Sequence, residues 1–377
     1  MKDLSSLREQ INEIDETLVK LFLKRMEIVS GVAEYKKRNS MEVLDKSREE
    51  QIINKHLQSI NDETQRIQLK DFLESLMYIS RKAQKKILSE DVACEKVDNN
   101  EAAYKIGFQG VAGSYSHQAL IEYFGDKVET EGFLNFKDVF EALKRDEIKY
   151  GILPIENSST GAITEVSDLL GEYNFYIVGE KCIKVDHNLL GVEGTELSDI
   201  EEVYSHTQGF LQCTQFFDEH SDWRLIPYYN TARSAEYISN ENSKKKACVA
   251  SKQAADVYGL KVLKENINNS SNNHTRFIII GKNIECNEQS NKVSVVIAIP
   301  HKVGSLHSIL KNFADNNCNM VKIESRPIVD KAWEYFFYID FDGNILDANT
   351  RSTLKSIEEE SLYFKLLGNY KSEVIYK

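Results

Sequence analysis

The sequence predicts a multidomain fold: an all-α helical domain that dimerises, then a two-lobed α/β domain, then a small βαββαβ domain. At 377 residues the chain is too long for a single hydrophobic core. Apolar residues recur at helical spacing near the start, and strand and helix patterns alternate after that. Polar, aperiodic stretches at 89–103 and 282–292 mark the boundaries. The predicted domains are therefore 1–90, 104–281 and 291–377.

The first predicted helix carries an apolar seam with one misfit. Steps of three and four residues separate the apolar members, which are Leu4, Leu7, Ile11, Ile14, Leu18 and Leu21. The next position on the seam holds Arg25, and Ile28, Val32 and Tyr35 follow it. A guanidinium that faces a helical core is costly unless an anion answers it. Arg25 is therefore a partner in a buried salt bridge, a side chain that extends to solvent, or the holder of an anionic ligand.

Two further cations on this helix favour the ligand. Lys36 lies 11 residues beyond Arg25, about 20° away around an ideal helix, so both side chains can reach one pocket. Arg8 lies 17 residues before Arg25, roughly 25 Å along the helix axis, which one small ligand cannot bridge. Arg8 is then either a surface charge or part of the pocket of a second protomer packed antiparallel. The second option predicts an obligate helical dimer.

The helical domain is completed by two more predicted helices, at 45–59 and 63–88. Asp45, Arg48 and Glu49 share a face of the first of these through their spacing. Ser80 and Gln84 interrupt the apolar stripe of the second, one turn apart, and buried polar groups of this kind need partners. The pocket contains no nucleophile–base pair. It suits a dianion held by charge and shape rather than covalent chemistry.

These residues carry a resemblance. The segments LREQIN, LFLKRMEI, AEYKK, DKSREE and SRKAQ are similar to the all-helical type of chorismate mutase over roughly residues 1–90. The resemblance implies that Arg25 and Arg8 of the partner subunit each hold a substrate carboxylate. It also implies that Lys36 and Gln84 contact the ether oxygen whose bond breaks, and the neutral Gln84 requires no acidic medium. Arg48 and Ser80 are implied to add contacts with a carboxylate. Glu49 is implied to hold the ring hydroxyl, with the Asp45 backbone nearby.

The middle segment alternates strands and helices, which predicts a two-lobed α/β domain around a cleft. The strand-like pieces KIGFQG, KYGILPI, EEVYS, RLIPYY and ACVAS each precede a helical pattern, and TRFIIIG closes the segment. Four of the connecting turns place hydroxyls or amides at helix starts, where unpaired N–H groups and the helix dipole favour anions. Helix capping explains each single turn as well, because Ser, Thr and Asn are good cap residues.

Taken together, the motifs GSYSHQA, LPIENSSTGAI, SHTQGFLQC and NNHTRFIIIG resemble prephenate dehydratase over the whole middle segment. The resemblance implies that prephenate loses its ring carboxylate as carbon dioxide and its ring hydroxyl as water, without a metal or organic cofactor. It implies that Thr275 is catalytic. Since a threonine hydroxyl is a poor acid, Glu156 stays open as the alternative proton source. The other implied prephenate contacts are Ser114, Ser116, Asn157, Ser158, Thr160, His206, Gln208 and Arg276.

The last segment reads strand, helix, strand, strand, helix, strand, which predicts a ferredoxin-like βαββαβ domain. It resembles an ACT regulatory domain, and its GSLH and ESRP runs resemble the phenylalanine-binding motifs of bifunctional P-proteins. A glycine that opens a helix lets a ligand carboxylate approach backbone N–H groups. The alternative for Glu324 and Arg326 is a surface ion pair. The implied effector site is Gly304, Ser305, Leu306, His307, Glu324, Ser325, Arg326 and Pro327.

Charge and cysteine content narrow the partners and the compartment. The net charge of −12 argues against nucleic acid and anionic membranes as general partners. No run approaches 18 apolar residues, and the opening MKDLSSLREQ lacks a secretory pattern, so we expect no membrane segment and a cytoplasmic protein. The six cysteines are scattered without metal-ligand spacing. They predict reduced thiols, with neither a disulfide framework nor a zinc site.

The three resemblances cover nearly all of the chain, in the order of the bifunctional P-protein family. They imply an enzyme of phenylalanine biosynthesis that converts chorismate to prephenate and then to phenylpyruvate, with feedback inhibition by phenylalanine. A homodimer or larger homo-oligomer is implied, and no metal or cofactor. Two alternatives stay open. One is an amino-acid binding protein without chemistry, and the other is a related enzyme that prefers arogenate.

Overall fold

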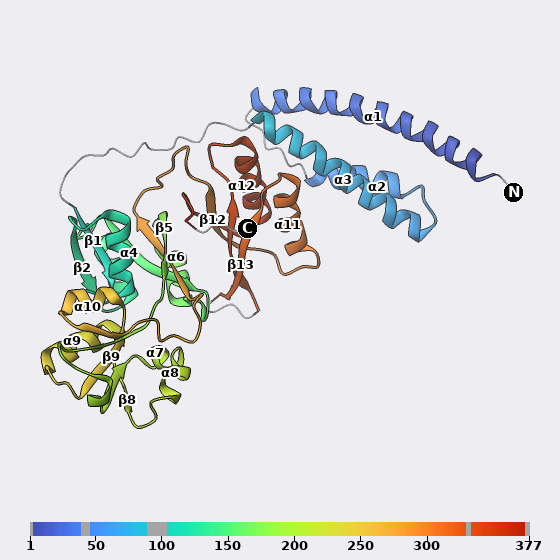
Figure 1. Cartoon of the computed structure of the whole chain (residues 1–377). Coiled ribbons are helices and arrows are strands. Elements are labelled where there is room, and N and C mark those ends of the chain that lie inside the picture. Colours follow the sequence, from blue (N-terminus) through green and yellow to red (C-terminus); the bar gives the residue numbers. More distant parts are fainter. Residues whose placement is uncertain (1–2, 39–45, 89–103, 329–332, 374–377) are drawn as a thin grey trace. The chain divides into compact units, whose positions relative to one another are not determined.

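The computed structural model describes residues 3–38, 46–88, 104–328 and 333–373 (Figure 1). The chain forms two compact units. The three N-terminal helices belong to the first unit, which also takes in residues 314–317 and 346–359, and the second holds the sheets that follow. Asp45, predicted as part of the mutase pocket, lies outside the described residues.

The helices of the first unit are α1 (Leu4–Arg38), α2 (Lys46–Leu57) and α3 (Glu63–Leu88). Helices α2 and α3 match the predicted 45–59 and 63–88, with ends that differ by at most two residues, and α1 covers the whole predicted seam. Helix α3 packs against both α1 and α2. The apolar seam of α1, from Leu4 to Leu21, is exposed in the single chain instead of covered. The buried residues among the described side chains of this helical group are Val29, Ala33, Met77, Ser80 and Gln84.

The middle segment begins with a lobe built on one sheet. Its strands are β1 (Lys105–Gln109), β2 (Glu129–Phe133), β3 (Tyr150–Asn157), β4 (Gly161–Ala162), β5 (Tyr176–Lys184) and β11 (His274–Gly281). Parallel pairing joins β2, β1 and β3, while β11 lies antiparallel between β3 and β5. The helices that pack on this sheet are α4 (Tyr115–Phe124), α5 (Phe136–Lys144) and α6 (Thr164–Glu172).

The chain leaves this sheet after β5, builds a second lobe, and returns as β11. The second sheet has the order β10-β6-β9-β7-β8, formed by Lys261–Lys264, Asn188–Gly191, Lys246–Ala250, Glu202–Ser205 and Arg224–Pro227. Its helices are α7 (Thr207–Leu211), α8 (Thr214–Asp218), α9 (Thr231–Glu241) and α10 (Lys252–Tyr258), with a short 3₁₀ turn at Leu197–Asp199. The two-lobed α/β prediction is confirmed.

One predicted helix of the second lobe is broken in two. The run FLQCTQFFDE predicts one helix, but the structure ends α7 at Leu211 and begins α8 at Thr214. The Asn269 side chain fills the break: its amide donates to Thr214 Oγ1 at 2.9 Å and its oxygen accepts from the Gln215 N–H at 3.1 Å. A side chain that inserts into the helical hydrogen-bond ladder is a recognised cause of such interruptions.

The C-terminal segment follows the predicted βαββαβ order. Its elements are β12 (Lys292–Ala298), α11 (Ser305–Asp315), β13 (Met320–Pro327), β14 (Tyr335–Asp342), α12 (Ala348–Glu360) and β15 (Tyr363–Tyr370). The strand order β13-β14-β12-β15 places the first and third strands at the centre, as in ferredoxin-like folds.

The C-terminal sheet continues into the first-lobe sheet. Strand β15 pairs in parallel with β5, and the combined sheet has ten strands. The contact is closest at Gly368, where a Cβ atom would lie 2.1 Å from the Ile177 backbone oxygen, so only glycine fits. Val296, Tyr338 and Leu367 belong to the same buried core as residues of the first lobe. The two segments therefore share one hydrophobic core.

Two general expectations also meet the structure. None of the helices in the described ranges is long and apolar enough to cross a membrane. Cys182, Cys213 and Cys248 are free thiols. Cys286 is disulfide-bonded, so the prediction of reduced thiols throughout is wrong at this position.

Candidate active sites

The predicted mutase residues meet where α1 faces α3. The Arg25 guanidinium donates a hydrogen bond to Ser80 Oγ, which donates in turn to the Leu76 carbonyl oxygen at 2.7 Å. Gln84 lies one turn further along α3 and is buried, and its Oε1 atom has no hydrogen-bond partner among the described residues. A buried amide oxygen without a hydrogen-bond donor is costly in a packed core. The unsatisfied Gln84 oxygen therefore favours a site at which a ligand binds.

A second contact ties α2 to this place. Glu49 on α2 forms an ion pair with Arg81 on α3, and each side chain is a quarter exposed. Arg81 is not among the predicted site residues, although it stands inside the SRKAQ motif between Ser80 and Gln84. The pairing holds the Glu49 carboxylate in place, which suits the predicted contact with a ring hydroxyl.

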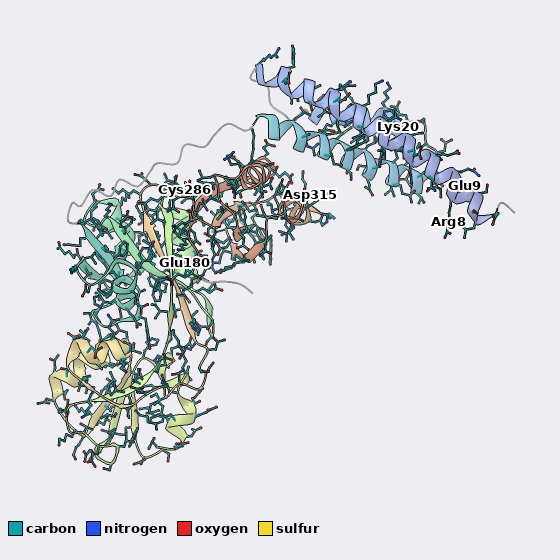
Figure 2. The ribbon with its side chains drawn as sticks, turned by 45° about the horizontal axis from the view of Figure 1, so that its top comes forward. Arg8, Glu9, Lys20, Glu180, Cys286 and Asp315 are labelled. Atoms are coloured by element: carbon teal, nitrogen blue, oxygen red, sulfur yellow. The ribbon has the colours of Figure 1, made fainter. Side chains whose placement is uncertain are left out.

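The other mutase residues lie on the outer parts of the helices. Lys36 is half-buried on α1, and Arg48 is exposed on α2. Arg8 is exposed near the N-terminal end of α1 (Figure 2). Because α1 is one continuous helix, the separation of Arg8 from Arg25 stays at roughly 25 Å. Arg8 therefore does not reach the Arg25 pocket of its own chain.

An apolar groove of about 410 Å³ runs beside Arg25. It is lined by Leu18, Val19, Leu21, Phe22, Arg25, Phe72, Ser75, Leu76 and Ile79. The groove lies next to the exposed seam of α1, so an extended apolar face stays uncovered in the single chain. Exposed apolar faces of this kind are typical of interaction surfaces.

In the middle segment, Thr275 and Asn157 occupy paired positions on β11 and β3. Thr275 is buried, and its Oγ1 accepts a hydrogen bond from Asn157 Nδ2 at 2.9 Å. The Asn157 oxygen accepts from the backbone N–H groups of Ser159 and Thr160, which fixes the orientation of the amide. The hydroxyl proton of Thr275 is thereby left available for a different acceptor.

The neighbouring predicted residues brace this pair. Ser158 Oγ accepts from the His274 N–H at 2.9 Å and donates to the Asn272 carbonyl at 3.1 Å. Thr160 Oγ1 donates to the Asn157 oxygen at 3.3 Å. The structure thus brings Asn157, Ser158, Thr160 and Thr275 together, as the motifs predict.

A chain of polar side chains leads from this pair into the second lobe. Asn157 Nδ2 donates to Asn273 Oδ1 at 2.8 Å, and Asn273 Nδ2 donates to Gln212 Oε1 at 3.2 Å. Gln212 Oε1 also lies 2.7 Å from His187 Nε2. Burial lowers the pKa of His187, so its imidazole is neutral at pH 7. These residues are not among the predicted ones, although Asn273 and Gln212 stand inside the NNHTRF and SHTQGFLQC motifs.

The remaining predicted residues lie at helix starts. Ser114 caps α4, where its Oγ accepts from the His117 N–H at 3.3 Å, and Ser116 is buried in the first turn. His206 caps α7, where its Nδ1 accepts from the Gln208 N–H at 3.2 Å. Both His206 and Gln208 are exposed. Capping accounts for the hydrogen bonds of Ser114 and His206, in line with the alternative noted for these turns.

Glu156 and Arg276 are predicted to lie in the same site as Thr275, but the structure does not group them with it. They pair with each other at 3.0 Å on the other face of the sheet, because successive residues of a strand point to opposite faces. Arg276 is buried and also lies 3.1 Å from Glu180 and 3.0 Å from Asp340. Its guanidinium is therefore engaged by protein carboxylates in place of the predicted contact with prephenate.

Comparison with known proteins gives two family matches. Residues 7–85 match the model of chorismate mutase type II, and residues 106–285 match that of prephenate dehydratase. A bifunctional chorismate mutase/prephenate dehydratase from Buchnera aphidicola is 33% identical over 380 residues, which covers 99% of this chain and 97% of the relative. The chain belongs to the bifunctional chorismate mutase/prephenate dehydratase family.

Two solved structures resemble a large part of the chain. One is a prephenate dehydratase from Arthrobacter aurescens in complex with L-Phe, with a TM-score of 0.65 and 28% identity, covering 71% of this chain and 90% of that one. The other is GqqA, described as a novel type of quorum-quenching acylase, with a TM-score of 0.66 and 25% identity, covering 71% and 98%.

The bifunctional enzyme converts chorismate to prephenate and prephenate to phenylpyruvate. The first reaction belongs to the helical segment and the second to the two-lobed segment. Neither reaction belongs to the C-terminal segment, and this segment has a surface pocket of its own.

A pocket of about 500 Å³ lies on the C-terminal segment of the bifunctional enzyme. Its lining consists of Ile299, Pro300, His301, Lys302, Val303, Ser305, Leu306, Trp333, Glu334, Tyr335 and Phe337. Two predicted effector residues, Ser305 and Leu306, are in this lining, and Gly304 adopts a left-handed φ of 84° beside them. His307 is exposed.

The ESRP motif lies on β13, away from this pocket. Arg326 forms two hydrogen bonds with the Asp168 carboxylate of α6, at 2.7 and 3.2 Å. Glu324 lies 3.1 Å from Lys322. Ser325 and Pro327 are exposed. The GSLH pocket and the ESRP motif are thus not combined into one site within the described chain.

Proposed function

We propose that the enzyme acts as a homodimer or larger homo-oligomer whose mutase sites are shared between subunits. Its domains are proposed at 1–90, 104–281 and 291–377. The observation that carries this proposal is the uncovered apolar seam of α1 beside the groove at Arg25. A second copy of the helical segment, packed antiparallel, covers the seam and brings Arg8 of the partner subunit to the Arg25 pocket.

In this arrangement the mutase site binds chorismate by charge and shape. Arg25 and Arg8 of the partner subunit hold its two carboxylates, with Arg48 and Ser80 in support. The Glu49 carboxylate accepts a hydrogen bond from the ring hydroxyl. Lys36 and Gln84 donate to the ether oxygen, where negative charge develops as the bond breaks. A rearrangement of this type gains mainly from compressing the flexible substrate and from stabilising that charge.

Subunit complementation tests the shared site. Arg8→Ala and Arg25→Ala chains are each expected to lose mutase activity. Chains of the two kinds, co-expressed, form hybrid dimers in which one site keeps both arginines. Random pairing then restores about a quarter of the wild-type mutase activity per chain, given a two-fold symmetric dimer. Dehydratase activity, measured on prephenate in the same samples, serves as the control and stays unchanged.

Two results contradict the shared site. Co-expressed chains that stay as inactive as the separate variants show that the two arginines do not complement each other. Full mutase activity in the Arg8→Ala chain alone shows that Arg8 is a surface charge.

We propose that Thr275 acts on the leaving hydroxyl of prephenate. Asn157 donates to Thr275 Oγ1, so the threonine hydroxyl directs its own proton to the departing oxygen. The C–C bond to the ring carboxylate breaks as carbon dioxide leaves, and the electron pair of that bond completes the aromatic ring. The C–O bond breaks at the same time, the departing oxygen takes the Thr275 proton and leaves as water, and solvent then returns a proton to Thr275 Oγ1. Water and phenylpyruvate are the other products. The ion-paired position of Glu156, on the opposite face, favours Thr275 over Glu156 for this role.

We further propose that the C-terminal segment is an ACT domain that binds phenylalanine as a feedback inhibitor. The solved relative with L-Phe supports this assignment, as do the pocket at GSLH and the ferredoxin-like strand order. Since GSLH and ESRP do not combine within the described chain, a second subunit is proposed to bring them together. Turnover of chorismate with and without phenylalanine tests the regulation.

A further inference from the structure

Ion pairs connect the dehydratase strands to the C-terminal strands inside the second unit. We call this group the buried charge cluster, and its members are Glu156, Glu180, Arg276, Lys292, Lys322, Glu324 and Asp340. Figure 2 labels Glu180, at the place where the two segments meet. The cluster has no part in the proposed chemistry, yet it begins one residue away from both Asn157 and Thr275.

Within this cluster, Lys322 lies between the carboxylates of Glu156 and Glu324. Its Nζ lies 3.3 Å from Glu156 on β3 and 3.1 Å from Glu324 on β13. The Lys322 side chain is only 16% exposed, so these attractions are weakly screened. A lysine ammonium is a compact charge on a flexible stem, and it can move toward either carboxylate when the other is neutralised.

The Glu156 end of this contact reaches the proposed catalytic hydroxyl. Glu156 and Asn157 are consecutive on β3, and Asn157 donates to Thr275 Oγ1 at 2.9 Å. The pairing of β3 with β11 shifts register between Arg276 and Phe277. Register shifts of this kind re-aim neighbouring side chains. A displacement of Glu156 therefore changes the geometry at Thr275.

The Glu324 end begins the ESRP motif. Glu324 Oε2 is buried, and Lys322 Nζ lies 3.1 Å from it. Arg276 Nε has no hydrogen-bond partner among the described residues. Glu324, Arg276 and Lys322 border a cavity of about 20 Å³, large enough for one water-sized group. The Glu324 carboxylate thus has room to turn. An amino-acid ammonium that binds it competes directly with Lys322.

We propose that Lys322 is a positioning residue that transmits the binding of phenylalanine from Glu324 to Glu156. The inference rests on the proposed regulatory role of the C-terminal segment. When the effector engages Glu324, Lys322 moves toward Glu156, and the change reaches Thr275 through Asn157. Without effector, Arg276 still holds Glu156 at 3.0 Å, so basal turnover does not depend on Lys322.

The test uses Lys322→Met in the full chain. Phenylalanine binding is measured by isothermal titration calorimetry, and kcat and KM for prephenate are measured with and without phenylalanine. Phenylalanine is expected to bind and basal kcat to stay near wild type, while the half-inhibitory concentration rises about tenfold or more, a typical coupling size. Lys322→Arg keeps the charge and is expected to keep the inhibition.

Lys181→Met is the matched control. Lys181 has the same 16% exposure and also contacts two carboxylates, Glu122 at 3.2 Å and Glu373 at 3.0 Å. It likewise joins the dehydratase segment to the C-terminal one, but neither partner belongs to the buried charge cluster. This variant is expected to be inhibited like wild type. An equal loss of inhibition in both variants would overturn the assignment to Lys322, because it would indicate general loosening of the contact between segments.

The remaining outcomes separate this inference from the proposed function. Wild-type enzyme that neither binds phenylalanine nor responds to it contradicts the regulatory function itself. A Lys322→Met enzyme inhibited like wild type overturns the transmission through Lys322. Loss of phenylalanine binding in that variant overturns it too, since Lys322 would then belong to the effector site. If circular dichroism shows that the Met variant is misfolded, Lys322→Gln undergoes the same measurements.

Discussion

Lys292 Nζ lies 2.8 Å from Glu180 Oε2, and both side chains are fully buried. Lys292 opens β12 of the C-terminal segment, while Glu180 belongs to β5 of the dehydratase segment. Glu180 Oε1 also accepts hydrogen bonds from Ser372 Oγ at 3.0 Å and from the Glu373 N–H at 3.2 Å. The two segments therefore share an ionised group in their common interior, and a change in one affects the stability of the other.

Loss of Lys292 is expected to destabilise the second unit. Lys292→Met leaves the buried Glu180 short of one cation, and breaking a buried ion pair costs about 3–5 kcal/mol. Urea unfolding followed by tryptophan fluorescence measures this, because Trp223 and Trp333 both lie in that unit. Lys181→Met, at a partly exposed pair, is expected to cost about 1 kcal/mol or less. Equal losses in the two variants contradict the prediction.

Acid is expected to weaken the same unit. Burial acts to raise the pKa of Glu180 and of Asp340, but Arg276 and the other cations outweigh it, and both pKa values lie below the ordinary range. A carboxyl with a lower pKa when folded stabilises above its unfolded pKa, and this contribution is lost as the pH falls through the folded value. The free energy of unfolding should thus hold down to about pH 5 and fall below about pH 4. The fall should be smaller in Asp340→Asn, and an increase in stability on acidification contradicts the account.

Removal of the Thr275 hydroxyl is expected to affect the dehydratase alone. Thr275→Ala should lower kcat for prephenate about a hundredfold or more, as expected for a group that moves a proton. KM should change little, and Thr275→Ser should recover much of the rate. Mutase turnover in the same preparations checks that the chain is folded. Unchanged dehydratase turnover in Thr275→Ala rules out this role.

The neutral amide of Gln84 predicts a specific pH effect in the mutase. Gln84→Glu replaces a permanent donor with a carboxyl that donates only when protonated. With an ordinary glutamate pKa of about 4.3, mutase kcat should be low at pH 7 and rise as the pH is lowered toward 5. Wild-type mutase should lack this rise. A variant that retains wild-type activity at pH 7 shows that the Gln84 donor does not stabilise the ether oxygen.

Much of the fold could be predicted because local patterns match the final packing. The helical seam gives α1 directly, and the polar interruptions Ser80 and Gln84 lie where α3 meets the mutase site. Strand β5 was missed because Glu180, Lys181 and Lys184 break its apolar pattern. Glu180 is tolerated inside the protein only through Arg276 and Lys292, which are 96 and 112 residues away along the chain. No local pattern reports such distant partners.

The dehydratase site shows the same division. Asn157 and Thr275 come together because their motifs occupy paired strand positions, and the motifs predict that grouping. Glu156 and Arg276 stand beside them in the sequence, yet the two-residue period of a strand turns them to the opposite face. The C-terminal segment covers the face that carries Glu156 and Arg276, because β15 pairs with β5. That long-range contact leaves no mark in either motif.

The proposed function is that one chain carries both reactions and that phenylalanine inhibits the second. Purified protein should be given chorismate, with prephenate and phenylpyruvate followed separately, in the presence and absence of phenylalanine. We expect that prephenate appears first, that phenylpyruvate follows, and that phenylalanine slows phenylpyruvate formation. Prephenate that accumulates without phenylpyruvate contradicts the dehydratase assignment, and phenylpyruvate formation that phenylalanine leaves unchanged contradicts the regulatory one.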